Sequence, residues 1–377
     1  MEIPILNLAD QPVAALQSQG KANVRRQTRR VMIGGIAVGG GAPISVQTMT
    51  KTKTSDIAAT VAQIIGAAEA GCDIVRVTVN DKEAADAMDE IVRQSPIPVV
   101  ADIHFNHIFA LKAIEANVAK VRINPGNIGS RERIHQVLSA AKDKGIPIRI
   151  GVNSGSLEED ILEKHGYPTA EALYESAMRH VAICDESGFR DIIISVKSTD
   201  VRLMIDAYRL VAQRTDIPLH LGVTEAGTTR IGTIKSAVGI GTLLAEGIGD
   251  TIRVSLTDEP VKEVEVGKEI LRSLGLATRN VELIACPTCG RLEVDLFAIM
   301  AELEKRLEGV KKPVKIAVLG CVVNGPGEAS EADIGIAAGK GVGILYRKGE
   351  VVRRVKESEI VDVIVEEVRN FQPELTT

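Results

Sequence analysis

The stretch DIVRVTVNDKEAADAMDEIVRQSPIPVVADIH, from Asp73 to His104, holds one complete unit of the pattern that decides the fold. A β-branched run at Asp73–Val79 is followed by a helical segment at Asp81–Gln94 and by a second apolar run at Val99–His104. Short buried runs that alternate with helical segments are typical of parallel strands joined by helices. We therefore expect further strand–helix units on both sides of this stretch.

The alternation continues through residues 44–257. The predicted strands are Ile44–Met49, Asp73–Val79, Val99–His104, Lys120–Asn124, Pro147–Asn153, Asp191–Lys197, Pro218–Val223 and Asp250–Leu256. Eight such units over roughly 210 residues match an α/β fold of the (β/α)8 TIM-barrel type, with its functional site at the carboxyl ends of the strands. A doubly wound sheet is the alternative, but no G-x-G-x-x-G motif opens a helix after the first strand.

Five of the predicted strands carry a cation within the apolar run. They are Arg76, Arg122, Arg149, Lys197 and Arg253. Any one of them is as well explained by a salt bridge at the barrel end, but together they would leave several uncompensated charges at the barrel mouth unless an anion neutralises them. Because arginine forks favour phosphate oxygens, we expect a phosphate or diphosphate ligand there.

Polar side chains accompany these cations near the predicted strand ends. The candidates for substrate contacts are Asp102, His104, Asn124, Asn153, Thr224 and Ser255. Period-two spacing puts Asn124 on the same side as Arg122, and Ser255 on the same side as Arg253. Glu225 follows the seventh predicted strand, so its carboxylate is placed at the mouth to move protons.

Three cysteines lie in the last quarter of the chain. Cys286 and Cys289 form a C-x-x-C pair, and Cys321 lies in the glycine-rich run Gly320–Glu328. Two thiolates on one tight turn can bind one metal centre, and a third completes one face of it. Glu328, after an Asn-Gly-Pro-Gly turn, would be the fourth ligand, because a carboxylate suits an iron that must open to substrate. A structural zinc knuckle and a reactive dithiol are the alternatives.

The predicted elements divide the chain into two domains. We expect an N-terminal lead-in at 1–30, a TIM-barrel substrate-binding domain at 31–274, a linker at 275–280 and a small α+β cluster domain at 281–377. In the last part, strands are expected at Val281–Ala285 and Val314–Leu319, helices at Leu292–Leu307 and Ser358–Asn370, and a hairpin from Gly343–Tyr346 to Val351–Val355. The basic cluster Lys21, Arg25, Arg26, Arg29 and Arg30 is expected to be solvated. The two other cysteines, Cys72 and Cys184, are expected to be buried and inert.

The composition is that of an ordinary globular protein. The 377 residues are 45% hydrophobic and 25% charged, with a net charge of −5, no Trp and 2% aromatic residues. Few aromatic residues and a negative charge argue against a nucleic-acid partner. No long apolar run follows the first methionine, and clustered cysteines fit a reducing compartment, so we expect a cytoplasmic protein with no membrane segment.

Four motifs resemble the bacterial 4-hydroxy-3-methylbut-2-enyl diphosphate synthases, which are iron–sulfur enzymes of the non-mevalonate isoprenoid pathway. The motifs are Gly39–Thr50, Lys120–Gly126, Ala285–Cys289 and Gly320–Glu328, and the likeness runs through nearly the whole chain. Thr48 stands where serine is expected in much of the family, so a hydroxyl is retained. The short segment before Cys286 is similar to the two-domain form of the family and not to the plant type with a middle domain.

The resemblance implies a [4Fe–4S] cluster held by Cys286, Cys289, Cys321 and Glu328. It implies that the substrate is 2-C-methyl-D-erythritol 2,4-cyclodiphosphate, opened and dehydroxylated with two electrons from flavodoxin or ferredoxin. The positions implied for substrate binding are Arg76, Arg122, Asn124, Arg149, Asn153, Lys197, Arg253 and Ser255, with Glu225 as acid or base. It also implies a homodimer in which the cluster domain covers the barrel of the partner.

Two other functions fit parts of the sequence. A barrel aldolase or pterin-type transferase with a structural zinc module explains the anion site but leaves Glu328 without a role. A non-enzymatic iron–sulfur carrier explains the cysteines but leaves the cations of the barrel without one. Iron and sulfide in anaerobically purified protein distinguish a cluster from zinc, and turnover of the cyclodiphosphate distinguishes an enzyme from a carrier.

Overall fold

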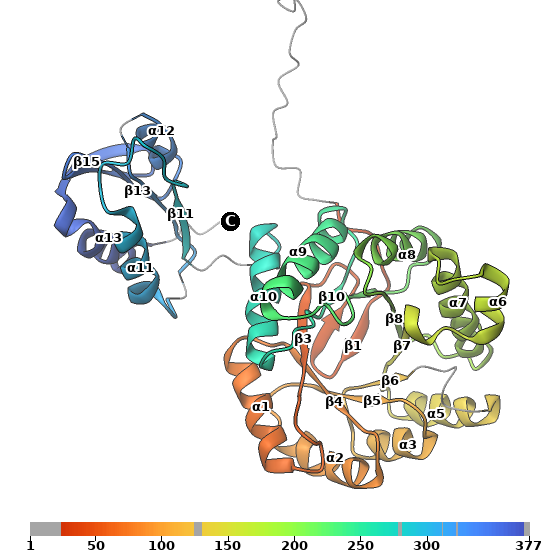
Figure 1. The fold of residues 1–377 in the computed structure, drawn as a ribbon. Helices are drawn as coiled ribbons and strands as arrows, with labels where there is room; N and C mark the ends of the chain where they lie inside the picture. Colours follow the sequence, from red (N-terminus) through yellow and green to blue (C-terminus); the bar gives the residue numbers. More distant parts are fainter. Residues whose placement is uncertain (1–23, 124–129, 278–280, 311, 322, 373–377) are drawn as a thin grey trace, which may run out of the picture. The chain divides into compact units, whose positions relative to one another are not determined.

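The computed structural model describes residues 24–123, 130–277, 281–310, 312–321 and 323–372. The chain divides into two compact units, Met1–Leu274 and Gly275–Thr377. Helices and strands alternate in the first unit, whereas the second combines one sheet with a few helices (Figure 1).

The first unit contains eight parallel strands in the order β8-β7-β6-β5-β4-β3-β10-β9. The strands are β3 (Ser45–Met49), β4 (Ile74–Thr78), β5 (Val99–Ile103), β6 (Lys120–Ile123), β7 (Ile148–Asn153), β8 (Ile192–Lys197), β9 (His220–Leu221) and β10 (Thr251–Ile252). A parallel bridge between Ile194 and Leu219 joins the two edges of the sheet. The predicted (β/α)8 barrel is confirmed, although its last two strands are shorter than expected.

Helices surround these strands (Figure 1). They are α1 (Ile57–Glu69), α2 (Lys82–Gln94), α3 (His107–Glu115), α5 (Arg131–Asp143), α6 (Glu159–His165), α7 (Ala170–Glu186), α8 (Val201–Arg214), α9 (Thr229–Ala245) and α10 (Pro260–Ser273). Several begin at a side chain that accepts a backbone N–H bond, as Asp81 does for α2 and Asp200 for α8. Gly71, Gly145 and Gly188 follow helix ends with positive φ, as the sequence predicted.

A short hairpin that the sequence analysis missed covers the amino-terminal end of the barrel. Its strands, β1 (Val31–Ile33) and β2 (Ile36–Val38), pair antiparallel. Val31, Ile33 and Val38 form an apolar cluster with Ile74, Val100 and Ile193, which lie near the starts of three barrel strands. Strands of three residues are too short to show a clear period of two, which is why the hairpin escaped prediction.

Part of the basic lead-in is docked on the barrel, so the prediction that it is solvated is wrong for Arg25 and Arg26, whereas Arg30 is exposed. Arg26 donates to the backbone oxygens of Ala212 and Thr215 at the end of α8. Arg25 donates to Gly249 O and pairs with the buried carboxylate of Asp250 at 3.3 Å. Helix-end carbonyls and a buried carboxylate both attract guanidinium groups, and this attraction explains the docking.

The second unit is a five-stranded sheet in the order β11-β12-β13-β14-β15, parallel over the first three strands and antiparallel over the rest. Its elements are β11 (Glu282–Ala285), α11 (Leu296–Leu307), β12 (Lys315–Leu319), α12 (Gly325–Ser330), β13 (Ile334–Gly339), β14 (Val342–Arg347), β15 (Glu350–Lys356) and α13 (Ile360–Asn370). Residues of α11 and α13 pack with those of the sheet in one apolar core. Strand β13 and helix α12 were not predicted.

Candidate functional site

The five predicted cations are all buried in the barrel. Arg76, Arg122, Arg149 and Lys197 are at most 9% exposed, and the side chain of Arg253 is 13% exposed. Burial and the charges of Arg149, Arg76, Arg253 and Arg122 all lower the pKa of the Lys197 ammonium, so the five groups share one interior. Arg76, Arg122 and Arg149 lie within their strands, whereas Lys197 is the last residue of β8 and Arg253 directly follows β10.

Asp102 holds two of these cations in place. Its carboxylate accepts from Arg122 Nη1 at 2.9 Å and lies 3.6 Å from Arg76 Nε. Burial by itself would raise the pKa of the Asp102 carboxyl, but the two guanidinium groups hold it well below its usual range. The contacts of Asp102 fix the positions of Arg76 and Arg122, and its predicted contact with substrate stays a prediction.

His104 is neutral and carries its proton on Nδ1. Its Nε2 lies 3.1 Å from Arg122 Nη1, and a guanidinium group can only donate, so Nε2 is the acceptor. Burial and the neighbouring Arg122 and Arg76 lower the pKa of the imidazole, although Asp102 opposes this shift. Nδ1–H therefore remains available as a hydrogen-bond donor.

Glu263 on α10 performs the same task for Arg253, and the sequence analysis missed it. Its fully buried carboxylate accepts from Arg253 Nε at 3.1 Å and Nη2 at 3.0 Å. It also accepts from the hydroxyl of Thr48 at 2.8 Å and from Leu256 N at 3.0 Å. The available signal was a carboxylate in the apolar stripe of a helix, since Glu263 lies between the buried residues Pro260 and Val264.

Arg149 and Lys197 are the cations without a carboxylate. Within the described parts of the chain, Nε and Nη1 of Arg149 have no hydrogen-bond partner, and the charged groups that act on Lys197 are arginines, with no carboxylate among them. Burying a charge without a partner is costly, so an anion that entered the barrel would be attracted first to these two groups. Lys197 Nζ lies over Gly222 of the loop after β9, where a Cβ would be 2.7 Å away.

The other predicted contacts are distributed around the strand ends. Asn153 is in direct register with Lys197, and Ser255 accepts from Arg253 Nη1 at 2.8 Å. Thr224 and Glu225 follow β9, and Glu225 is exposed with φ at 50°, a conformation that non-glycine residues seldom adopt away from functional sites. Asn124 lies outside the described residues.

In the second unit, Cys286 and Cys321 follow neighbouring parallel strands. Ala285 at the end of β11 pairs in register with Val318 of β12, so the two cysteine-bearing loops leave the same edge of the sheet. Thr288, between Cys286 and Cys289, has φ at 63°. This left-handed conformation is unusual for a β-branched residue and indicates a constrained loop.

The thiols fall into two chemical classes. A hydrogen bond from Arg291, at 3.5 Å from Cys289 Sγ, lowers the pKa of Cys289. Backbone N–H groups of Asn324 and Val323 lower that of Cys321. Burial raises the pKa of Cys72 and Cys184 to about 12, in agreement with the prediction that both are inert. Because thiolates are the metal-binding form, the donor set fits a cluster.

Glu328 lies in α12, which begins at Gly325, so the prediction that it ends an Asn-Gly-Pro-Gly turn is wrong. Its side chain is exposed. Asn324 occupies the N-cap position and Pro326 the first turn, where its missing N–H costs nothing. Among the residues whose positions are described, no bond to the Glu328 carboxylate is present and no three His, Cys, Asp or Glu side chains converge as around a single metal ion. An iron–sulfur cluster is larger than one ion, so its ligands need not converge on one point.

Two family models match the two units. The GcpE TIM-barrel domain matches residues 28–268, and the GcpE protein C-terminal domain matches residues 282–370. The chain belongs to the GcpE family. No helix among the described residues of this GcpE chain is long and apolar enough to cross a membrane.

Curated relatives carry one name, 4-hydroxy-3-methylbut-2-en-1-yl diphosphate synthase (flavodoxin). The protein from Clostridium perfringens is 59% identical over 341 residues, 90% of the GcpE chain described here and 98% of the relative. That from Symbiobacterium thermophilum is 56% identical over 93% of this chain and 95% of its own length. A dihydropteroate synthase structure from Xanthomonas albilineans covers 65% of this chain and 97% of its own at 14% identity, with a TM-score of 0.47, a likeness that says nothing about function.

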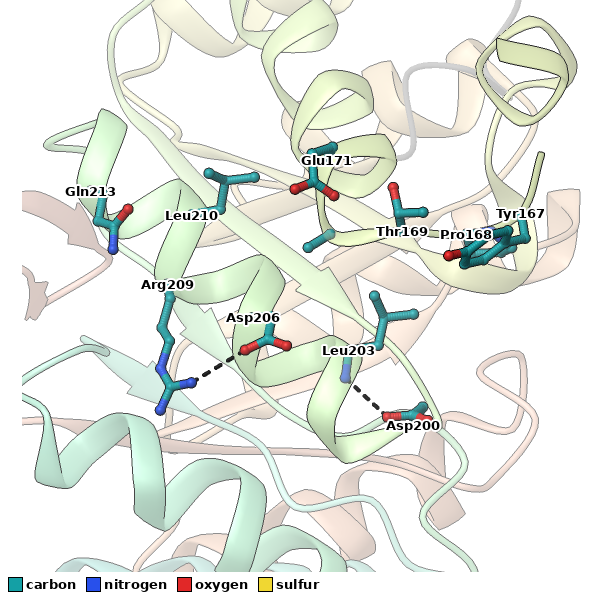
Figure 2. Close-up of a pocket in the computed structure, with 11 residues that line it drawn as sticks. Tyr167, Pro168, Thr169, Glu171, Asp200, Leu203, Asp206, Arg209, Leu210 and Gln213 are labelled. Carbon is teal, nitrogen blue, oxygen red and sulfur yellow. Dashed lines mark hydrogen bonds and ion pairs between the residues drawn. The ribbon is translucent and has the colours of Figure 1, made fainter. Parts of the chain in front are cut away.

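A pocket of about 660 Å³ lies between the start of α7 and the length of α8 in this GcpE chain (Figure 2). Several of its charged side chains are bonded within or at the start of α8: Asp200 accepts from Leu203 N, and Asp206 binds Arg209 at 3.2 Å. It contains none of the predicted site residues. The barrel interior, with its unpartnered cations, is the better candidate for the anion site.

Proposed function

We propose that this GcpE chain converts 2-C-methyl-D-erythritol 2,4-cyclodiphosphate to (E)-4-hydroxy-3-methylbut-2-enyl diphosphate. The observation that carries the proposal is the pair of buried cations Arg149 and Lys197, which have no carboxylate among the described residues, whereas Arg76, Arg122 and Arg253 are held by Asp102 and Glu263. The name of the curated relatives, which contains a diphosphate product, supports the same chemistry.

The charge balance of the barrel favours a diphosphate. Five cations, Arg76, Arg122, Arg149, Lys197 and Arg253, are matched by the two carboxylates of Asp102 and Glu263. The surplus positive charge lies in a buried interior, where Coulomb attraction is weakly screened. Arg149 would bind phosphate oxygens with its free Nε and Nη1, and Lys197 would add a point charge.

Cys286, Cys289, Cys321 and Glu328 would hold a [4Fe–4S] cluster in the second unit. Hydrogen bonds that lower the thiol pKa of Cys289 and of Cys321 support this ligand set. When bound, the cluster supplies two electrons, received one at a time from flavodoxin or ferredoxin, and a Lewis-acidic iron. Arg291 donates a hydrogen bond to Cys289 Sγ, and its positive charge partly balances the negative charge of the thiolates.

The chain's own residues also handle a proton. Cleavage of the ring and loss of one hydroxyl take up two electrons and one proton and release one water. Glu225 would give that proton, because its exposed carboxyl lies in the loop after β9 and has no described partner. The neutral His104 would orient a substrate oxygen through Nδ1–H, while Arg122 occupies Nε2.

Metal analysis separates this proposal from the two alternatives. Anaerobically purified protein should be brown and contain about four iron and four sulfide per chain. A colourless protein with zinc would favour a barrel lyase or transferase with a structural zinc module. A four-iron protein that binds no cyclodiphosphate would favour a carrier.

A homodimer with shared sites belongs to the same proposal. We expect the inactive variants Lys197→Ala and Cys289→Ser to restore one another when their subunits exchange, because one site of the mixed dimer then has an intact barrel and an intact cluster. Activity of the mixture should approach about a quarter of the wild-type value, since half of the molecules are mixed and each has one working site. Mixed dimers that form but remain inactive would show that each chain serves itself.

Gly151 tests the position of the Arg122 guanidinium. A Cβ at this position would lie 2.5 Å from Arg122 Nε, and Gly151 O accepts from Nη2 at 3.3 Å. We expect Gly151→Ala to fold, because a side chain can yield, but to move the guanidinium and raise the KM for the cyclodiphosphate about tenfold. Gly155→Ala, where a Cβ meets no atom within 4 Å, is the control. Equal KM values for the two variants would refute this role.

A further inference from the structure

Lys120, the first residue of β6, is a buried lysine that the anion site described above does not include. Its side chain is 0% exposed. It lies two residues before Arg122 and therefore points into the barrel as Arg122 does. Its one described partner is the side-chain oxygen of Gln47 on β3, 3.3 Å from Nζ.

The groups that face Lys120 do not compensate its charge. Arg149 on β7 and Arg76 on β4 repel it, and the imidazole of His220 on β9 responds to the same cations. The charged groups of the surrounding elements are Arg76, Arg122, Arg149, Lys197 and Arg253, together with the carboxylates of Asp102 and Glu263, which are bonded to arginines. Among the described residues, Lys120 therefore has an amide oxygen as its hydrogen-bond partner and no carboxylate as an ion-pair partner.

We propose that Lys120 is a sixth cation of the diphosphate site and that its amine takes up a proton from solvent when the substrate binds. The proposal rests on the function proposed above and deepens it by coupling binding to protonation. In the free protein, burial and the repulsion by Arg149 and Arg76 push the pKa of the ammonium well below its usual range. A doubly charged ligand beside Arg149 reverses this repulsion, so the amine becomes an ammonium with no other bond made or broken.

The direction of the pH dependence follows from this coupling. A group whose pKa is higher in the complex than in the free protein binds a proton together with the ligand. Affinity should therefore decrease as pH rises between the lowered pKa of free Lys120 and its pKa in the complex. The cyclic diphosphate itself adds no titration in this range, because each phosphorus carries a single strongly acidic hydroxyl.

Isothermal titration calorimetry of the anaerobic, unreduced holoenzyme with the cyclodiphosphate tests the proposal. Titrations in two buffers of different ionisation enthalpy give the number of protons taken up per bound substrate. We expect Lys120→Met to reduce that number by about one relative to the wild type and to weaken binding about tenfold. The control is Lys142→Met, an exposed lysine of α5, which should change neither quantity.

A structural role for Lys120 gives a different result. If the amine only packs the barrel, Lys120→Met should leave the proton number unchanged, and this outcome overturns the proposal. The thermal unfolding midpoint of substrate-free Lys120→Met should equal or exceed that of the wild type, because a buried polar amine is replaced by an apolar side chain. A clear decrease with an unchanged proton number would count against the proposal in the same way. A wild type that binds no cyclodiphosphate refutes instead the function on which the proposal rests.

Discussion

Turnover of the cyclodiphosphate should fall about a hundredfold or more when Glu328 is replaced by alanine. Loss of groups that merely support a metal ligand already costs 10–100-fold, so loss of a ligand should cost at least that much. In the free chain the carboxylate is exposed on α12 and has no described partner, so its removal breaks no observed contact. The prediction is measured as dithionite-driven turnover of anaerobically reconstituted protein, with iron counted in the same sample.

Two further variants make the Glu328 result specific. Glu331→Ala, one helical turn later and also exposed, should keep full activity and a full iron count. Glu328→Cys should still assemble a cluster but turn over slowly, because a thiolate is softer and less readily displaced than a carboxylate. Full activity of the alanine variant with four irons would remove Glu328 from the ligand set.

Asp102→Asn should lower the free energy of unfolding by about 3–5 kcal/mol, the usual cost of removing one partner from a buried ion pair. The variant leaves the guanidinium groups of Arg76 and Arg122 with no charged partner at the centre of the barrel. Chemical denaturation at neutral pH measures the effect. The loss should be smaller with bound cyclodiphosphate, because the ligand supplies the missing negative charge.

Asp86→Asn is the matched control for Asp102→Asn. Asp86 pairs with Lys112 on the exposed surfaces of α2 and α3, and such pairs contribute about 0–1 kcal/mol. The pKa of Asp102 is depressed in the folded protein, so its stabilising contribution is present above the carboxyl pKa of the unfolded chain and is lost as pH falls. Equal stability of the two variants would mean that Asp102 does not hold the two arginines.

Much of the fold could be predicted because its signals are local. The eight barrel strands appear as β-branched runs between helical segments, and Gly71 and Gly188 mark helix ends with positive φ. The spacing of the C-x-x-C pair also predicted that Cys286 and Cys289 lie on one loop, and this loop directly follows β11. Hairpin β1–β2, strand β13 and helix α12 are short or glycine-rich, and their formation depends on contacts with distant residues.

The charge balance of the barrel could not be predicted, because it depends on which side chains meet across strands. Glu263 lies ten residues beyond Arg253, and its role appears once α10 packs against β3 and brings the carboxylate to Arg253 and Thr48. Lys120 belongs to one of the recognised motifs, but its partner Gln47 lies 73 positions away in the sequence. Sequence periodicity predicts that the side chains of such residues point into the barrel, but it does not predict which groups they contact there.

The stoichiometry of product to electrons tests the central claim most directly. Reconstituted protein is mixed anaerobically with isotope-labelled cyclodiphosphate and a counted amount of reduced flavodoxin, and the product is identified by nuclear magnetic resonance. The account predicts one (E)-4-hydroxy-3-methylbut-2-enyl diphosphate for every two electrons consumed. Intact cyclodiphosphate after many equivalents of reductant, in a protein that holds its full four irons, would contradict it.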